Sequence, residues 1–420
     1  MLGLVLTAGG ARGAYQAGVL KRLGELRSLR GRPSPFAVIA GASAGAINGT
    51  LLAARGARFG EATGEIARVW SNLRVEDVFA SDLGSLARTG ASLARDFVLG
   101  SVLGHTRTHG LLDTSPLAAL LERLFPPRGI AEALRRGHLH AVAVTATSYH
   151  SGRSFTFVEG RPGHAIWAKS RRLVLPVSLT SRHVLASCAI PIVFPPVRLA
   201  SQAGDLWFGD GGLRLVAPLS PAIRLGASHI FSVGVRSSRA AESLAREEVG
   251  AAATPPDGAP RLPCPPLAQV TGVFLNAIFL DHLDADLDHL ARMNEIVASG
   301  KSGAGTSEPI RRVTPLALAP SEDLALVAKR FAHRMPRVVR FMLEGLGTPD
   351  AQSADLMSYL LFDAAYTRAL VEIGYADAGR RGEEIETLIH AAPPPRPSPQ
   401  RAGRTPAMPA RSLGLGAATT

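Results

Sequence analysis

A short apolar run, residues 36–40, leads directly into the sequence Gly-Ala-Ser-Ala-Gly at residues 41–45 and then into a helical pattern. This order places Ser43 on a tight turn between a strand and a helix, with its hydroxyl held above the sheet. Gly41 lets the backbone bend sharply, and Gly45 lets the helix pack close to the strand. The positive end of the helix faces the serine and favours negative charge there. The segment therefore predicts a nucleophile elbow.

A second glycine cluster, residues 8–18, follows the apolar run Leu2 to Thr7 and precedes another helical pattern. A strand that feeds a glycine-rich turn into a helix presents several backbone N–H groups to an anion. A dinucleotide-binding turn is the rival interpretation, but Gly-x-Gly-x-x-Gly is not matched from Gly9, and the next strand ends in the serine elbow. A turn with a packing role alone is the third interpretation.

The third motif is an aromatic strand that ends in Asp210 and a Gly-Gly turn, within residues 206–212. Alone, such an aspartate is typical of an ordinary turn. A serine hydroxyl, however, needs a neighbouring group to accept its proton before it becomes a good nucleophile. Together with the elbow, Asp210 is a candidate for that base.

A histidine would be the usual base, and a Ser–Asp–His order would indicate a conventional triad. His229 opens an apolar strand, whereas His282 and His289 lie in an amphipathic helix rich in aspartate. We expect each of them to be structural or exposed, and a conventional triad stays the minor alternative.

These motifs, with Ala-Ser-x-Ala-x-Pro-x-x-Phe-Pro-Pro-Val at residues 186–197, occur in the order found in the patatin-like phospholipases, and residues 2–235 resemble that family. The resemblance implies a serine acyl hydrolase that uses a Ser–Asp dyad, with Ser43 as nucleophile and Asp210 as base. The other implied site residues are the oxyanion-hole residues Gly9, Gly10, Ala11 and Arg12, the elbow glycines Gly41 and Gly45, and Gly211 and Gly212 of the Asp-Gly-Gly motif. Ala8 departs from the three consecutive glycines that such loops often carry.

Strand and helix signals alternate through the first 235 residues, which predicts a three-layer α/β/α sheet with its site at the carboxyl ends of the strands. We expect a catalytic domain over 1–235, an exposed linker over 236–266, a mainly helical extension over 267–390 and a disordered tail over 391–420. The expected strands are 141–147, 230–235 and 312–318, and the expected helices are 116–125, 267–298, 321–346 and 354–373.

The formal charge is +12, and only four of the 46 basic residues are lysine. Arginine and alanine bias reflects genome composition, so we expect no nucleic-acid partner, but contact with anionic lipid headgroups is consistent with this charge. Cys188 and Cys264 form no disulfide framework, and no metal-ligand cluster or cofactor motif is apparent. Without a signal peptide or a membrane-length apolar run, the expected location is cytoplasmic, with visits to membrane surfaces.

The predicted activity is hydrolysis of lipid carboxylic esters, of the phospholipase A, lysophospholipase or esterase type, through an acyl-enzyme. An acyltransferase with the same dyad is one alternative, and a lipid-sensing protein with little turnover is another. The apolar stretch 270–280, with Phe274 and Phe279, is a core helix or a lid beside the serine. The sequence makes no prediction of oligomeric state.

Overall fold

The computed structural model describes residues 1–80, 110–126, 128–169, 171–201, 204–237, 282–299, 311–336, 340 and 354–394. These residues form one ten-stranded sheet. Eight of its strands follow the order β10-β9-β1-β2-β3-β4-β6-β5, and the other two are β8, which pairs with β3, and β7, which pairs with β8. The strands are β1 Leu2–Leu6, β2 Val38–Ala42, β3 Ala141–Ser148, β4 Ser154–Gly160, β5 Ala168–Lys169, β6 Arg172–Pro176, β7 Val197–Ser201, β8 Gly204–Gly209, β9 His229–Val233 and β10 Thr314–Leu318.

The five strands from β10 to β3 run parallel, with Leu6 of β1 opposite both Gly41 of β2 and Val233 of β9. Beyond β3 the sheet turns antiparallel, because β4 and β8 both pair with it in the opposite direction. The carboxyl ends of β1, β2 and β9 therefore meet at one edge, which is where a doubly covered parallel sheet places its site.

Helices cover both faces of the sheet. They are α1 Gly13–Gly24, α2 Ala44–Arg55, α3 Phe59–Ser71, α5 Ser115–Leu124, α6 Gly129–Arg136, α7 Ser181–Ser187, α8 Ser220–Arg224, α11 His282–Ala298, α12 Leu324–Arg330, α14 Ala354–Leu360, α15 Ala364–Arg380 and α16 Gly382–Ala391. Short 3₁₀ turns are η1 Gly10–Arg12, η2 Arg27–Leu29, η3 Val75–Asp77, η4 Gly211–Arg214 and η5 Ala332–Arg334.

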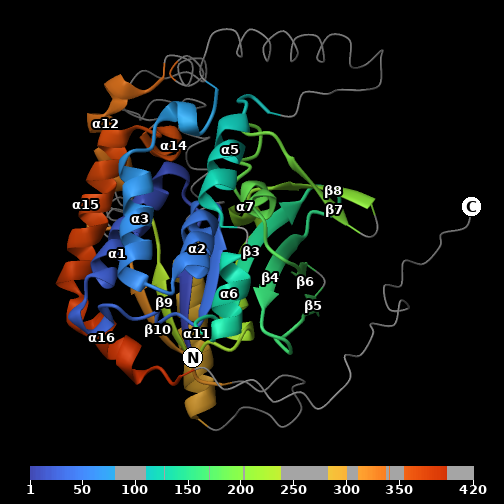
Figure 1. Ribbon diagram of the computed structural model, residues 1–420, viewed down its shortest axis with the longest axis vertical. Coiled ribbons are helices and arrows are strands. Elements are labelled where there is room, and N and C mark those ends of the chain that lie inside the picture. Colours follow the sequence, from blue (N-terminus) through green and yellow to red (C-terminus); the bar gives the residue numbers. More distant parts are fainter. Residues whose placement is uncertain are drawn as a thin grey trace, which may run out of the picture.

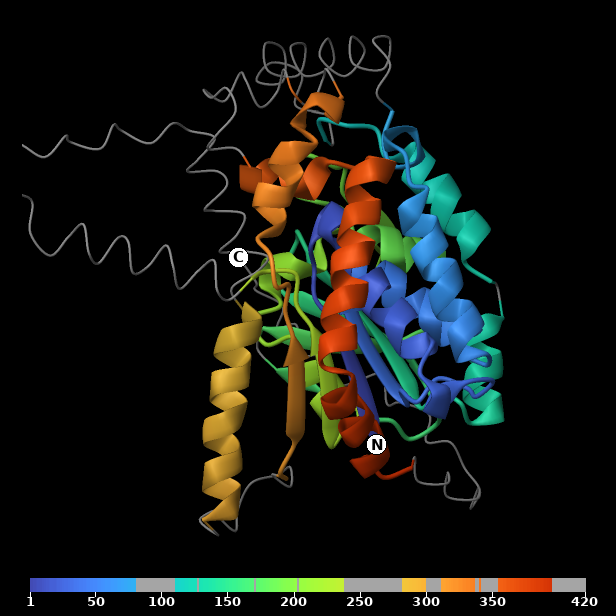
Figure 2. The same ribbon diagram turned by 90° about the vertical axis from the view of Figure 1, so that its left-hand side faces the viewer.

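The two faces have separate hydrophobic cores. Along β1, Leu4 and Leu6 belong to the larger core, whereas Val5 points into the smaller one with Leu283 and Leu290 of α11. In Figure 2, α11 (gold) stands on the opposite side of β9 and β10 from α15 (red) and from α1, α2 and α3 (blue). The predicted three-layer α/β/α arrangement is confirmed, with the heavier helical layer on the side of α1 and α2 (Figure 1).

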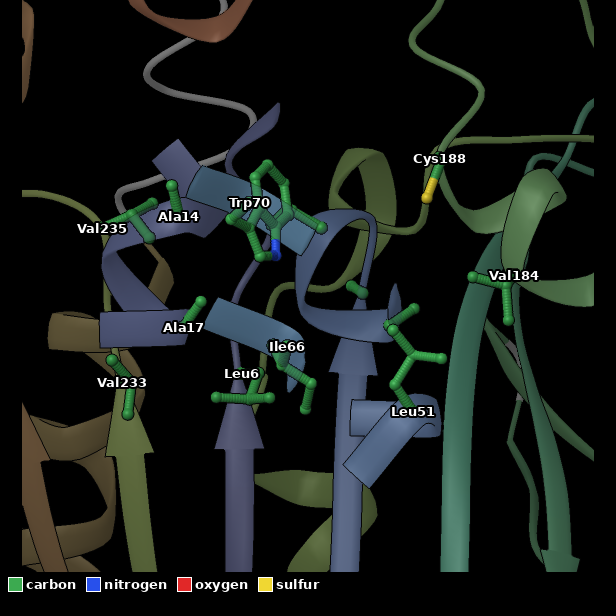
Figure 3. Close-up of a cluster of buried hydrophobic side chains, with 14 of the residues drawn as sticks. Leu6, Ala14, Ala17, Leu51, Ile66, Trp70, Val184, Cys188, Val233 and Val235 are labelled. Atoms are coloured by element: carbon green, nitrogen blue, oxygen red, sulfur yellow. The ribbon is translucent and has the colours of Figure 1, made fainter. Parts of the chain in front are cut away.

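The larger core packs directly beneath the carboxyl edge of the sheet. Figure 3 shows Leu6 and Val233 at the ends of β1 and β9, under Ala14 and Ala17 of α1. All four side chains are buried. The loops that leave these strand ends therefore start from a rigid base.

The C-terminal part of the chain completes this body. β10 pairs in parallel with β9, and α15 lies along α1. The two helices approach so closely that a Cβ on Gly18 would lie 2.0 Å from the Val371 carbonyl oxygen, and one on Gly374 would lie 2.1 Å from that of Tyr15. Both glycines are thus required by the helix contact.

The predicted strands 141–147, 230–235 and 312–318 and the predicted helix 116–125 are confirmed as β3, β9, β10 and α5. The expected helix 267–298 is described only from its α11 part onward. The apolar stretch 270–280, most of the expected linker 236–266 and most of the expected tail 391–420 lie outside the described residues.

Two long helices were predicted wrongly. The pattern over 321–346 is interrupted after α12 at Arg330, and Met335 is extended because Pro336 disfavours the helical conformation of the residue before it. Arg340 is helical again, and residues 337–339 and 341–346 lie outside the described residues. The pattern over 354–373 is broken into α14 and α15 at residues 361–363. There Asp363 caps the second helix by accepting hydrogen bonds from the N–H groups of Ala365 and Tyr366.

Candidate active site

Ser43 occupies the turn between β2 and α2, at the carboxyl edge of the sheet. Its backbone has φ 53° and ψ −126°, a conformation that a non-glycine residue adopts only at a cost. A Cβ on Gly41 would lie 2.3 Å from the Gly45 carbonyl oxygen, and one on Gly45 would lie 2.2 Å from that of Leu6. The close packing predicted for Gly45 is thus observed, and Gly41, which was predicted to allow a sharp bend, also has no room for a Cβ. The amino end of α2 points at the serine.

Ser187, at the end of α7, holds this turn in place. Its hydroxyl accepts a 2.8 Å hydrogen bond from the Ser43 N–H and donates a 2.6 Å bond to the Thr145 carbonyl of β3. Ser187 belongs to the 186–197 block, and this contact was not predicted from the sequence. An isolated serine in an apolar block carries no signal that it supports a backbone turn elsewhere.

Asp210 lies between β8 and η4, and its side chain lines a cavity together with Ser43. Its Oδ1 accepts a 2.8 Å hydrogen bond from the Gly212 N–H, and a Cβ on Gly211 would lie 2.0 Å from the Thr145 carbonyl oxygen. Its Oδ2 is buried and accepts no hydrogen bond from the described residues.

Burial raises the pKa of Asp210 to about 7, against the opposing effects of the Ser43 hydroxyl and the Gly212 N–H. The structure thus brings Ser43 and Asp210 together, as the sequence predicted. A buried carboxylate with one unoccupied oxygen beside a serine hydroxyl has the geometry of a general base.

The glycine loop forms the 3₁₀ turn η1 beside Ser43. Gly10 has φ +54°, and a Cβ there would lie 2.5 Å from the Tyr359 carbonyl oxygen. The N–H of Arg12 donates a 3.0 Å bond to the Gly9 carbonyl, so this N–H is already engaged. None of the described residues accepts a hydrogen bond from the N–H of Gly10 or Ala11. Among the four predicted oxyanion-hole residues, Arg12 has its N–H engaged, whereas the N–H groups of Gly9, Gly10 and Ala11 have no acceptor among the described residues.

The side chain of Arg12 points away from Ser43, toward α14. Its Nε donates a 2.8 Å bond to the Ser358 hydroxyl, and its Nη2 forms a 2.9 Å ion pair with Asp355. The guanidinium also lies 4.6 Å from the centre of the Tyr359 ring. Arg12 is only 2% exposed, so these contacts fix the glycine loop to the C-terminal part of the chain.

Replacing Arg12 with Ala should lower the free energy of unfolding by about 2–4 kcal/mol, because the buried Ser358 and the partner carboxylate lose a charged donor. Thermal unfolding measures this loss. Arg12→Lys should recover only part of it, since an ammonium cannot form the forked contact. Arg58→Ala, which removes an exposed ion pair with Glu61, is the matched control and should change stability by less than about 0.5 kcal/mol. Equal melting points for the Arg12→Ala variant and the wild type would contradict this role.

A buried polar network joins the glycine loop to α2 and α3. The amide of Asn48 donates to the Gly13 carbonyl at 3.0 Å and to Gln16 Oε1 at 3.1 Å, and its oxygen accepts a 2.6 Å bond from the Trp70 indole. Gln16 in turn donates to the Thr7 carbonyl at 2.9 Å. This network was not predicted from the sequence, because Gln16, Asn48 and Trp70 each lie within an ordinary helical pattern.

Two cavities meet at Ser43. The first is apolar apart from Ser43: its walls come mainly from α2, α3 and α5, and Cys188, Ile190, Phe194 and Phe362 also line it. The second lies between the glycine loop and α14 and is lined by Asp210, Tyr359 and apolar side chains. Gly10, Ser43 and Ile190 belong to both.

The three histidines lie elsewhere. His229 pairs with Leu2 at the amino end of the sheet, opposite Ser43, and His282 and His289 are on α11 over the other face. Among the described residues, no histidine lines either cavity. The described part of the chain also holds no group of three or more metal-ligating side chains. Cys188 is a buried free thiol, and Cys264 is outside the described residues.

The model of the family described as patatin-like phospholipase matches residues 4–223. No curated protein sequence matches this chain significantly. VipD from Legionella pneumophila is 12% identical with a TM-score of 0.30 over 93% of this chain and 66% of its own. Human GIVD cytosolic phospholipase A2, in complex with methyl gamma-linolenyl fluorophosphonate, is 15% identical with a TM-score of 0.41 over 93% of this chain and 58% of its own. This chain thus spans less than two thirds of the length of either protein.

Proposed function

This chain belongs to the patatin-like phospholipase family, and from that premise we propose that it hydrolyses carboxylic esters of lipids through a Ser43–Asp210 dyad. The observation that carries the proposal is the position of Ser43, which lies beside a buried carboxylate and opens into an apolar cavity. A lipid ester requires both a nucleophile with its base and apolar surface for its acyl group.

In the proposed reaction, Ser43 Oγ attacks the ester carbonyl carbon while its proton passes to the free Oδ2 of Asp210. The N–H groups of Gly10 and Ala11, together with the amino end of α2, stabilise the negative charge on the carbonyl oxygen. The tetrahedral intermediate collapses, the proton on Asp210 moves to the departing alkoxide, and an acyl-enzyme remains. Water then attacks this ester while its proton passes to Asp210, and that proton moves to Ser43 Oγ as the fatty acid is released.

We also propose that the protein works on lipid surfaces. The net charge of +12 favours anionic headgroups. Ile192 is 77% exposed, has φ 71° and lies next to Val193 of the second cavity, so an apolar side chain reaches solvent beside the site. None of the described helices is long and apolar enough to cross a membrane.

The purified protein should release free fatty acid from phosphatidylcholine vesicles, and faster when phosphatidylglycerol is added. Mass spectrometry of the products, with and without glycerol as an added acceptor, measures both outcomes. Acyl groups diverted to glycerol would make the protein an acyltransferase. Absence of any acyl product with either vesicle would contradict the proposed function.

A further inference from the structure

The main chain of Asp210 is held at both of its polar groups. Its N–H donates a 2.8 Å hydrogen bond to the Ala189 carbonyl, and its carbonyl accepts a 2.9 Å bond from the Thr147 hydroxyl. Thr147 is only 2% exposed and pairs with Gly209, the residue before Asp210, where β3 meets β8. The backbone of the aspartate is therefore fixed relative to β3.

The main chain of Ser43 is held by the same two segments. Its N–H donates to Ser187, whose hydroxyl donates in turn to the carbonyl of Thr145 on β3. Thr145 lies two residues before Thr147 on that strand. Ser187 lies two residues before Ala189, at the end of α7. One strand and one helix end thus hold both the nucleophile and its base.

Close packing joins the two sets of hydrogen bonds. A Cβ on Gly211 would lie 2.0 Å from the Thr145 carbonyl oxygen and 3.1 Å from the Ser187 hydroxyl oxygen. The turn that follows Asp210 therefore packs against the two groups that support Ser43. A shift of either catalytic residue would disturb the support of the other.

The carboxylate of Asp210 depends on this main-chain support for its orientation. In a nucleophile–base pair the base is normally oriented by a third group. Here Oδ1 accepts its hydrogen bond from a main-chain donor, the Gly212 N–H, and among the described residues no third side chain bonds the carboxylate. The position of Oδ2 relative to Ser43 therefore follows the position of the backbone.

We propose that Thr147 and Ser187 are positioning residues that together set the separation of Asp210 and Ser43, an inference that rests on the proposed function. Thr147 acts on the base through its carbonyl, and Ser187 acts on the nucleophile through its N–H. Neither of them belongs to the lining of the two cavities at Ser43. Loss of either hydroxyl should therefore lower kcat and leave KM near its wild-type value.

The first test compares Thr147→Val with Thr147→Ser, with p-nitrophenyl butanoate as the substrate. Valine keeps the branched shape and removes the hydroxyl, whereas serine keeps the hydroxyl and removes a methyl group. Because a misplacement of about 1 Å costs about a hundredfold in rate, Thr147→Val should lower kcat about 10–100-fold with KM unchanged. Thr147→Ser should retain most of the wild-type kcat. Thermal unfolding of both variants shows whether activity follows the hydroxyl or the stability.

Thr63→Val on α3 is the matched control. Thr63 is also fully buried, and its hydroxyl also donates to a main-chain carbonyl, that of Gly60 at 3.1 Å. It lines neither cavity at Ser43. The same loss of a hydroxyl should therefore leave kcat at the wild-type value.

A double-mutant cycle separates positioning from general damage to the fold. In the Asp210→Asn background, Thr147→Val should lower the rate of fluorophosphonate labelling by less than about twofold, because the misplaced group no longer accepts a proton. Ser187→Ala tests the support from the side of the nucleophile and should lower kcat by about as much as Thr147→Val. It also replaces Thr147→Val in the test if that variant does not fold.

Three results would each overturn this inference alone: a wild-type kcat in Thr147→Val or Ser187→Ala, equal losses in Thr147→Val and Thr147→Ser, or an undiminished further loss in the Asp210→Asn background. Absence of both ester hydrolysis and labelling in the wild type would overturn the proposed function and this inference together.

Discussion

The Ser43→Ala variant should show no covalent labelling by a fluorophosphonate probe and should lose ester turnover by about a million-fold, because the attacking oxygen is removed. Gel fluorescence after labelling and fatty-acid release measure the two effects. The variant should fold normally, since the Ser43 N–H bond to Ser187 and the backbone at φ 53° do not depend on the hydroxyl.

Ser28→Ala is the control for this prediction. Ser28 is half-buried and donates a hydrogen bond to Glu386, in the turn that follows α1. Its variant should label as the wild type does. Labelling that persists in Ser43→Ala would place the nucleophile on another residue.

Asp210→Asn should reduce kcat/KM by about 10⁴-fold, because an amide cannot accept the proton of Ser43. The amide oxygen can still accept the Gly212 N–H, so the turn itself should persist. Asp205→Asn is the matched control: Asp205 lies on the same strand, β8, with an exposed side chain paired to Arg198. Wild-type rates in Asp210→Asn would exclude this carboxylate as the base.

The pH profile tests the same assignment without a substitution. Asp210 must be ionised to act as a base, and burial raises its pKa to about 7. The wild-type kcat/KM should therefore increase with pH through about 7 and be low in mild acid. An acid limb with its midpoint near the ordinary carboxylate value of 3.8 would contradict the burial of this group.

As the pH rises, the contribution of Asp210 to the free energy of unfolding should decrease while the catalytic activity increases. Because the pKa of Asp210 is higher in the folded chain, about 7, than its ordinary value of 3.8, the protonated form favours folding. This stabilisation is complete below pH 3.8 and is lost as the pH rises through 7. Asp210→Asn removes this pH-dependent loss of stability. Above pH 7 the variant should unfold at a higher temperature than the wild type, with a free energy of unfolding that is higher by up to about 4 kcal/mol. An inactive but more stable variant would show that the site carries a cost in stability.

The sequence predicted the parts of the fold that depend on local pattern. The elbow at Ser43, the glycine loop and the buried strands are each contiguous, and the glycines reveal the turns directly. The partners that come from other parts of the chain were not predictable in the same way. Ser187 and Asn48 act through single hydrogen bonds that leave no periodic signal.

In the C-terminal half, too, a local element was predictable from the sequence whereas a helix break and a long-range contact were not. The strand at 312–318 was recognisable from its apolar run, but the break between α14 and α15 was hidden by a helical periodicity that continues across it. Nothing in the sequence around Asp355 indicates that it meets Arg12. The first cavity beside Ser43 was likewise not predictable, since the leucines of α5 have the same spacing whether they face a core or a cavity.

The contact between Arg12 and α14 also has a consequence for how the chain is made. These partners are separated by 343 residues, which a ribosome adds in about 20–70 s at roughly 5–20 residues per second. During that interval Ser43 has already been synthesised, but Arg12 has no ion-pair partner on α14. For much of the interval β1 also lacks its neighbouring strand β9. Contacts of such long range also slow folding. Synthesis itself therefore delays the Arg12 contact that holds the glycine loop until α14 has emerged.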